Sequence, residues 1–182
     1  EIKDFMVVRL GLSGLSLAEH YRMGRLIQEE AERMGRRVFY VASGDLSHKM
    51  ERSGPYGFDP AGPAYDQKVM DLLGRGDFKE LLEFPASFCE KAAECGHRSI
   101  CIMAGALDKK KVKTEVFSHQ GLTGVGYGLV FYELLGEDSS RDFLDQWERQ
   151  EKEKLKKKRE NEDPYLRLAR ETVETYVLSG RP

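Results

Sequence analysis

Several features that would assign this chain to a special class are missing from its 182 residues. No apolar run approaches the length that a helix needs to span a bilayer, and no secretory signal stands at the start. The 29 basic residues are balanced by 31 acidic residues, so no basic excess predicts binding to nucleic acid. The sequence therefore predicts a globular protein with neither a nucleic acid nor a membrane as its partner.

Cysteine is also scarce, with three residues in the chain. An odd number argues against a disulfide framework and fits the reducing cytoplasm, where we expect the protein to reside. The spacing of Cys89, Cys95 and Cys101 lacks the close pairs that are typical of a zinc site. We expect Cys101 to be a buried free thiol.

The length is enough for one domain of ordinary size with its own core. Both ends nevertheless suggest truncation. The chain begins at Glu1 without a methionine and enters a predicted strand almost at once, and it stops directly after a strongly periodic helix. We therefore expect a fragment of a longer protein.

The first quarter of the chain predicts a strand, a helix and a second strand. Residues 5–12 are mostly apolar and lead into a Gly/Ser turn, and residues 36–43 (RRVFYVAS) form a second apolar run. Ser16 and Glu19 have the spacing of a helix capping box, and Gly35 ends the helical pattern. Strands joined by one helix run parallel. We therefore predict an α/β fold with a mainly parallel sheet flanked by helices.

The middle of the chain continues with helices and two further strands. Residues 49–63 hold three glycines and three prolines and predict a long loop. We expect its part from Glu51 to Pro63, with Tyr56 and Phe58, to shape the substrate site. Helical patterns follow between residues 64 and 108. Residues 111–121 and 126–135 predict two strands, and the short Gly-rich loop between them favours an antiparallel pair.

The last third of the chain is highly charged. From Glu148 to Asp163, thirteen of sixteen residues are charged, seven basic and six acidic, which predicts a solvated linker helix over residues 137–162. Asp163 as a cap, Pro164 at the first position and Gly180 as a stop predict another amphipathic helix. Its apolar stripe needs a partner surface, either its own sheet or a second copy of the chain.

Two polar clusters are candidates for chemistry. Asp45 and His48 follow a predicted strand, at the kind of sheet edge where α/β proteins bind ligands. The alternative is that Asp45 is a turn or cap residue and His48 a surface or packing histidine. Glu94 stands among small residues and needs a metal ion, Arg98 or a helix N-terminus as its partner, with His97 near the same pocket. The alternative there is a capping glutamate with a surface histidine.

The remaining histidines give weaker signals. His20 lies within the first amphipathic helix, where we expect a structural role. His119 ends a predicted strand before the Gly-rich stretch GLTGVGYG. That stretch precedes another strand rather than a helix, so it lacks the geometry of a nucleotide-binding fingerprint.

Three stretches together resemble a known family. SGDLSH, ECGHRSICIMAGALD and GVGYGLVFY resemble the class III extradiol ring-cleavage dioxygenases of LigB-like fold, and among them the proteins grouped with Memo. DPYLRLARETVETYVLSG resembles the opening helix of an AMMECR-type domain. This resemblance implies the C-terminal part of a LigB-like domain over residues 1–136, the charged linker helix over 137–162, and the first helix of a truncated AMMECR-type domain over 163–182.

The resemblance also implies a cofactor and site residues. The family holds Fe(II) with two histidines and one carboxylate, which leaves positions open for a catechol-like substrate and O₂. Carried over, Glu94 is the carboxylate ligand, and Cys95 is the alternative ligand because Memo-type members use a cysteine at this position. His48 is implied as the acid–base residue for the substrate hydroxyl, and Asp45 as the residue that orients its ring.

The chain departs from the family pattern at one point. The two metal-binding histidines of the family lie in the first half of its domain, and the motifs matched here all come from the second half. We therefore expect the missing half as a partner, Fe(II) bound by the longer parent, and weak or no iron binding and no activity in this chain alone. Two rival functions stay open. One is a Memo-like metal-binding or redox module, and the other is a metal-dependent hydrolase that uses Asp45, His48 and Glu94.

Overall fold

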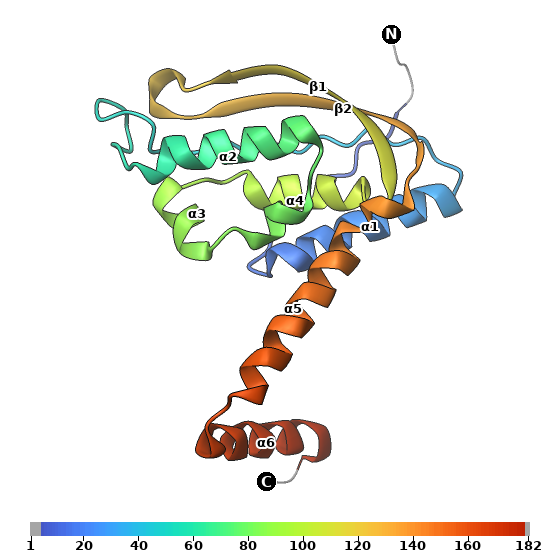
Figure 1. The fold of residues 1–182 in the computed structure, drawn as a ribbon. Helices are drawn as coiled ribbons and strands as arrows, with labels where there is room; N and C mark the ends of the chain where they lie inside the picture. The colour runs from blue at the N-terminus through green and yellow to red at the C-terminus, as the bar shows by residue number, and fades with distance from the viewer. Residues whose placement is uncertain (1–4, 181–182) are drawn as a thin grey trace. The chain divides into compact units, whose positions relative to one another are not determined.

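The computed structural model describes residues 5–180, and the chain divides into two compact units, Glu1–Leu144 and Asp145–Pro182. Figure 1 labels the main elements. Their bounds are α1 Leu17–Arg33, α2 Ala61–Arg75, α3 Ala86–Ala92, α4 His97–Ala106, β1 Lys110–Gln120, β2 Tyr127–Glu137, α5 Phe143–Glu160 and α6 Pro164–Ser179. Short 3₁₀ helices cover Lys79–Glu83, Leu122–Gly124 and Ser139–Arg141. No helix within residues 5–180 combines the length and the apolar character that crossing a membrane requires.

The predicted mainly parallel sheet is wrong. In the part of the chain that the structure describes, the sheet has two strands, β1 and β2, which pair antiparallel from Lys110 opposite Glu137 to Gln120 opposite Tyr127. The antiparallel pairing expected for these two strands is confirmed. The rest of the described fold is mostly helical (Figure 1).

The prediction failed at the two apolar runs on either side of α1. Residues 5–12 and 36–43 form no strand, and most of their apolar side chains are exposed, with Val8 at 81% and Phe39 at 77%. An apolar sequence becomes a sheet strand only where a neighbouring strand satisfies its backbone N–H and C=O groups. Neither run has such a neighbour among the described residues, so the apolar pattern alone was not enough to predict a strand.

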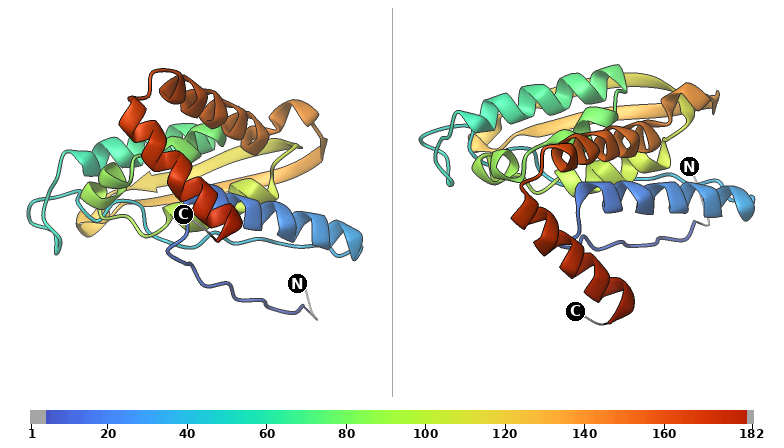
Figure 2. Two further views of the ribbon diagram at one scale, coloured as in Figure 1. Left: turned by 90° about the horizontal axis from the view of Figure 1, so that it is seen from below. Right: turned by 60° about the horizontal axis from the view of Figure 1, so that its bottom comes forward.

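Helix α1 begins as the sequence predicts and packs closely on α4. The Glu19 carboxylate accepts from the Ser16 backbone N–H at 3.0 Å, and the Glu19 N–H donates to the Ser16 hydroxyl at 3.3 Å. A Cβ on Gly105 would lie 1.9 Å from the Tyr21 carbonyl oxygen, so only a glycine permits this approach. Figures 1 and 2 show the two helices side by side.

Helix α2 covers one face of the β1–β2 sheet. The Tyr132 hydroxyl on β2 donates to the Leu73 carbonyl oxygen on α2 at 2.7 Å, and the Tyr132 ring meets Phe78 edge-on. The core between the sheet and the helices contains fully buried aromatic and aliphatic side chains, among them Tyr65, Val69, Leu72, Phe78 and Leu81. This core is the support on which the site loops rest.

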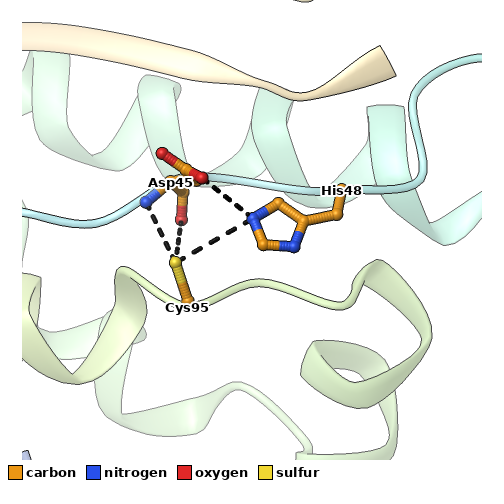
Figure 3. Close-up of side chains that lie close together, drawn as sticks. All are labelled: Asp45, His48 and Cys95. Carbon is orange, nitrogen blue, oxygen red and sulfur yellow. Dashed lines mark hydrogen bonds and ion pairs between the residues drawn. The ribbon is translucent and has the colours of Figure 1, made fainter. Parts of the chain in front are cut away.

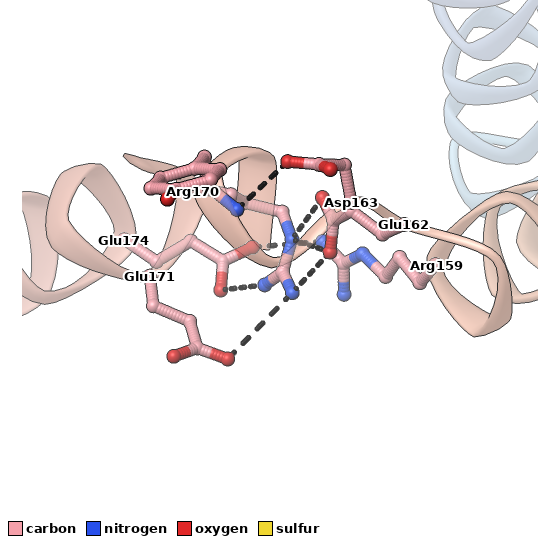
Figure 4. A network of polar contacts seen from close by, with 7 residues as sticks. Arg159, Glu162, Asp163, Arg170, Glu171 and Glu174 are labelled. Atoms are coloured by element: carbon pink, nitrogen blue, oxygen red, sulfur yellow. Dashed lines mark hydrogen bonds and ion pairs between the residues drawn. The ribbon is translucent and has the colours of Figure 1, made fainter. Parts of the chain in front are cut away.

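The unit Asp145–Pro182 consists of most of α5, which is charged along its length, and of α6. The Asp163 side chain accepts from the Tyr165 N–H at 2.9 Å, and Gly180 ends α6 in the left-handed conformation, so both predicted helix ends are confirmed. Arg170 binds the Glu162 carboxylate through two nitrogens and also reaches Glu174 (Figure 4). The assignment of these helices as linker and AMMECR-type start, and the need of α6 for a partner, stay predictions.

Candidate metal centre

Two glycines bring the candidate site together. Gly44 precedes Asp45, and Gly96 follows Cys95 at the start of α4. A Cβ on Gly44 would lie 2.4 Å from the Gly96 Cα, so the two backbones are in direct contact. The Gly96 N–H donates to the Asp45 carbonyl oxygen at 2.9 Å. This contact joins stretches of chain that are 50 residues apart in sequence.

Buried hydrogen bonds hold the loop on its other sides. Ser47 is fully buried, and its N–H donates to the Asp66 carboxylate at 2.8 Å. The Ser47 hydroxyl donates to the Ala92 carbonyl oxygen at 2.8 Å, and the His48 N–H donates to the same oxygen at 3.1 Å. The Gly126 N–H donates to the Ser47 carbonyl oxygen at 2.7 Å. The backbone that carries the Asp45 and His48 side chains is therefore fixed by three separate segments.

The side chains of Asp45, His48 and Cys95 converge on one point (Figure 3). His48 Nε2 lies 3.1 Å from Asp45 Oδ2 and 3.9 Å from Cys95 Sγ. The Asp45 backbone N–H donates to the same sulfur at 3.2 Å. The three ligand atoms lie within 4.8 Å of one another, and the group is open to solvent on the cysteine side. The structure thus brings together two residues of the first predicted cluster and one of the second.

This arrangement differs from a nucleophilic triad. In a triad the two imidazole nitrogens have different partners. One faces the nucleophile and the other faces the carboxylate. Here the single atom Nε2 of His48 faces both the Asp45 carboxylate and the Cys95 sulfur. Ligands at 2.0–2.3 Å from a tetrahedral metal lie about 3.3–3.8 Å apart, which is close to the two separations seen here. Imidazole, carboxylate and thiol are all metal ligands, so the donor group fits a metal ion.

Glu94 lies outside this group of three. Its carboxylate accepts from the His97 backbone N–H at 2.7 Å and so satisfies a free donor at the start of α4. This is the capping geometry that the sequence left open as an alternative. A ligand role for Glu94 stays a prediction.

His97 is not a surface residue. It is fully buried, its Nε2–H donates to the Leu81 carbonyl oxygen at 2.8 Å, and its Nδ1 accepts from the Tyr65 hydroxyl at 2.9 Å. Burial lowers the pKa of His97, because the charged ring would lose its hydration. Both nitrogens have protein partners, so His97 is a packed neutral histidine and not a ligand.

The other two histidines have separate surroundings. His20 is buried in α1, with Nδ1 2.9 Å from the Ser16 carbonyl oxygen, which agrees with the structural role expected for it. His119 lies at the end of β1, with Nε2 3.0 Å from Asp66 Oδ2. Burial raises the pKa of Asp66, while His119 and the Ser47 N–H act in the opposite direction.

Sequence reasoning missed Asp66, which links His119 to the site loop. The signal was present, because Asp66 shares the helical spacing of the buried residues Val69, Met70 and Leu73 on α2. A carboxylate at a core position of an apolar stripe indicates buried donors for it elsewhere in the fold.

The three cysteines differ in exposure. The buried free thiol expected at Cys101 is confirmed, and burial raises its pKa far above the usual range. Burial also raises the pKa of the half-buried Cys89, to about 11. Cys95 is exposed. Of the three thiols, Cys95 is therefore the most accessible to a metal ion in solvent.

Comparison with known proteins identifies the family of the chain. Residues 1–130 match the family described as the catalytic LigB subunit of aromatic ring-opening dioxygenase. The match covers more than two thirds of the chain, and the protein belongs to the LigB family. The resemblance inferred from the sequence motifs is thereby confirmed at the level of the family.

One relative has been found along nearly the whole chain. Protein CA_C1420 of Clostridium acetobutylicum is 35% identical over 178 residues, which are 98% of this chain and 38% of the relative. The chain therefore spans little more than a third of the length of that protein, whose name states no activity.

Proposed function

We propose that the Asp45–His48–Cys95 group belongs to the metal centre of a LigB-family dioxygenase that opens a catechol-like ring with O₂. One observation carries the proposal. Three metal-binding side chains converge within 4.8 Å, inside the segment that matches the family. When bound, a ferrous ion would supply positions for O₂ and for the substrate oxygens.

The residues of this chain have distinct tasks in the proposal. Cys95 offers its sulfur to the metal from the rigid turn before α4. Asp45 Oδ2 holds Nε2 of His48 at 3.1 Å and so sets the direction of the imidazole. His48 takes a proton from a substrate hydroxyl and returns it during ring opening, a task for which histidine is the commonest choice in enzymes. The two histidine ligands of the family are expected from outside this sequence.

His48 has a rival role as a ligand, because Nε2 points at the same place as the Cys95 sulfur. The two roles predict different effects of His48→Ala. If His48 transfers protons, the variant loses turnover and keeps its metal. If His48 is a ligand, the variant loses metal and turnover together. Measuring metal content beside oxygen uptake separates the two roles.

The test is anaerobic loading with Fe(II), followed by metal analysis and oxygen-electrode assays with a panel of catechols. Both this chain and the longer Clostridium relative are loaded. We expect the relative to hold about one iron and to consume O₂ with at least one catechol, and this chain to hold iron weakly without oxygen uptake. Iron without oxygen uptake in the relative would refute ring cleavage.

Matched variants locate the site in this chain. Cys95→Ala should reduce metal binding, measured with Co(II) or Zn(II) as well as Fe(II). Glu94→Gln keeps an oxygen that can accept from the His97 N–H and should leave metal binding unchanged. The opposite pattern would identify Glu94 as the ligand, the assignment implied by the family resemblance.

A metal-binding or redox module of Memo type, without ring cleavage, is the second candidate. The presence of Cys95 in the donor set favours it, because thiolates prefer softer ions such as Cu(I) and Zn(II) over Fe(II). This candidate predicts tight Zn(II) or Cu(I) binding and no consumption of O₂ with any catechol.

A further inference from the structure

Tyr56 stands beside the Asp45–His48–Cys95 group without belonging to it. Its ring stacks on the His48 imidazole, with 5.0 Å between the ring centroids and 24° between the planes. Tyr56 is 54% exposed, so the stack is not a by-product of burial in the core. The ring separation lies in the range that aromatic pairs prefer.

The loop that carries Tyr56 is anchored through its backbone. The Lys49 ammonium donates to the Tyr56 carbonyl oxygen at 2.5 Å, and Met50 and Phe58 form an isolated antiparallel bridge across the loop. A Cβ on Gly54 would lie 2.9 Å from the Gly124 Cα, so the loop also rests against the turn between the strands. These contacts hold the Tyr56 ring over His48 although little else covers it.

Two contacts restrain the His48 ring, one with Asp45 and one with Tyr56. The contact with Asp45 Oδ2 restrains the position of one ring atom, Nε2. Rotation of an imidazole about its last side-chain bond is soft, so one contact leaves the tilt of the ring open. The stack on Tyr56 restrains the ring plane. Together they direct Nε2 at the point that Cys95 Sγ also faces (Figure 3).

We propose that Tyr56 is a positioning residue that fixes the imidazole plane of His48 and thereby prepares the Asp45–His48–Cys95 group for its metal. This inference rests on the proposed metal centre. The aromatic ring of Tyr56 carries the effect, and its hydroxyl does not.

The first test is Co(II) binding to the 182-residue chain, followed through the absorption of the cysteine–cobalt bond. Tyr56→Ala should raise the Kd for Co(II) about 10-fold, the lower end of what loss of an outer-shell partner costs a metal site. Tyr56→Leu, which keeps an apolar side chain without a flat ring, should behave like Tyr56→Ala. Tyr56→Phe should bind Co(II) as the wild type does. Phe58→Ala, in the same loop, controls for general loss of an exposed aromatic residue.

The second test needs no metal. Carbon-13 relaxation of the His48 ring in the metal-free protein should show a rigid imidazole in the wild type and in Tyr56→Phe, and a more mobile one in Tyr56→Ala. The free energy of unfolding of all variants should stay near that of the wild type, because Tyr56 is mostly exposed.

The outcomes separate the two proposals. Absence of Co(II) binding in both the wild-type chain and the longer Clostridium relative counts against the metal centre, and His48 ring mobility alone then decides the role of Tyr56. Equal ring mobility in the wild type and in Tyr56→Ala would overturn the positioning role, whatever the metal does. A Tyr56→Phe variant that behaves like Tyr56→Ala would overturn it as well, because the hydroxyl would then carry the effect.

Discussion

Residues 38–43 and residues 45–48 are neighbours in sequence and opposites in structure. The first segment is mostly apolar and largely exposed, with Val41 at 68%. The second is polar in three of its four positions, yet Ser47 within it is fully buried. Hydrophobicity alone therefore does not predict burial in this part of the molecule, where the polar Ser47 is as buried as the apolar Leu46 beside it. Ser47 meets Asp66, Ala92 and Gly126, whereas no described strand pairs with residues 38–43.

The largest expected effect comes from breaking the backbone contact of the site loop. Gly44→Ala places a Cβ 2.4 Å from the Gly96 Cα. The nearest atoms that this Cβ would meet all belong to the backbone of Cys95 and Gly96, so no flexible side chain can move aside to relieve the clash. We expect a loss of about 1–3 kcal/mol in the free energy of unfolding, as for an overpacked core, together with weaker Co(II) binding. Urea unfolding measures the first effect and cobalt titration the second.

The matched control is a glycine in an exposed apolar run, residues 5–12. A Cβ on Gly11 would meet nothing within 4 Å, so Gly11→Ala should leave both quantities unchanged. Equal losses for Gly11→Ala and Gly44→Ala would mean that the exposed segment is packed in solution.

Removing the Ser47 hydroxyl should have the next largest effect. This hydroxyl donates to the Ala92 carbonyl oxygen and accepts from the Lys49 N–H at 2.9 Å, and both partners lose a hydrogen bond in Ser47→Ala. We expect a loss of about 1–3 kcal/mol in the free energy of unfolding. Ser43→Ala, at an exposed position five residues from His48, is the control and should be neutral. A neutral Ser47→Ala would show that the hydroxyl does not hold the loop.

The raised pKa of Asp66 predicts how the free energy of unfolding depends on pH. Burial raises the pKa of Asp66 above its ordinary value of 3.8, so the folded protein binds more protons than the unfolded chain just above that pH. The contribution of Asp66 to stability is therefore full below pH 3.8 and is lost as the pH rises through the raised pKa of the folded state.

The variant Asp66→Asn removes this titration and leaves Asp108, another carboxylate whose pKa burial raises, in place. The difference in free energy of unfolding, variant minus wild type, should therefore increase as the pH rises from 3.8. Urea titrations at a series of pH values measure this difference. A difference that is flat or decreasing with pH would contradict the raised pKa of Asp66.

The smallest effect is expected in the exposed apolar segment. Val41→Ser should change the free energy of unfolding by less than about 0.5 kcal/mol, because most of the side chain is already in water. Val8→Ser, in the other unpaired run, should behave in the same way. A loss of several kcal/mol for either variant would show that these runs are covered in solution, and the contrast with the site loop would then disappear.

The sequence could predict the parts of the fold that depend on near neighbours. The capping box of Ser16 and Glu19 and the Asp163 and Gly180 ends of α6 involve residues a few positions apart, so the pattern contains all the partners. The antiparallel β1–β2 pair follows from a short loop for the same reason. The motif match likewise placed the chain in the LigB family from local stretches alone.

For the candidate site the sequence by itself determined the ingredients, a polar loop at Asp45 and His48 and a second cluster around Glu94, where the family resemblance made Cys95 the alternative ligand. Only the tertiary structure decided that Cys95 rather than Glu94 meets His48, and that the buried Asp66 on α2 anchors the loop. It also decided against the parallel sheet, because no described strand lies beside the two apolar runs. The physical reason is the same in each case. A side chain or a strand needs its partner in space, and such a partner can lie far away in the sequence. Cys95 is 50 residues from Asp45 and is held beside it where Gly44 contacts Gly96.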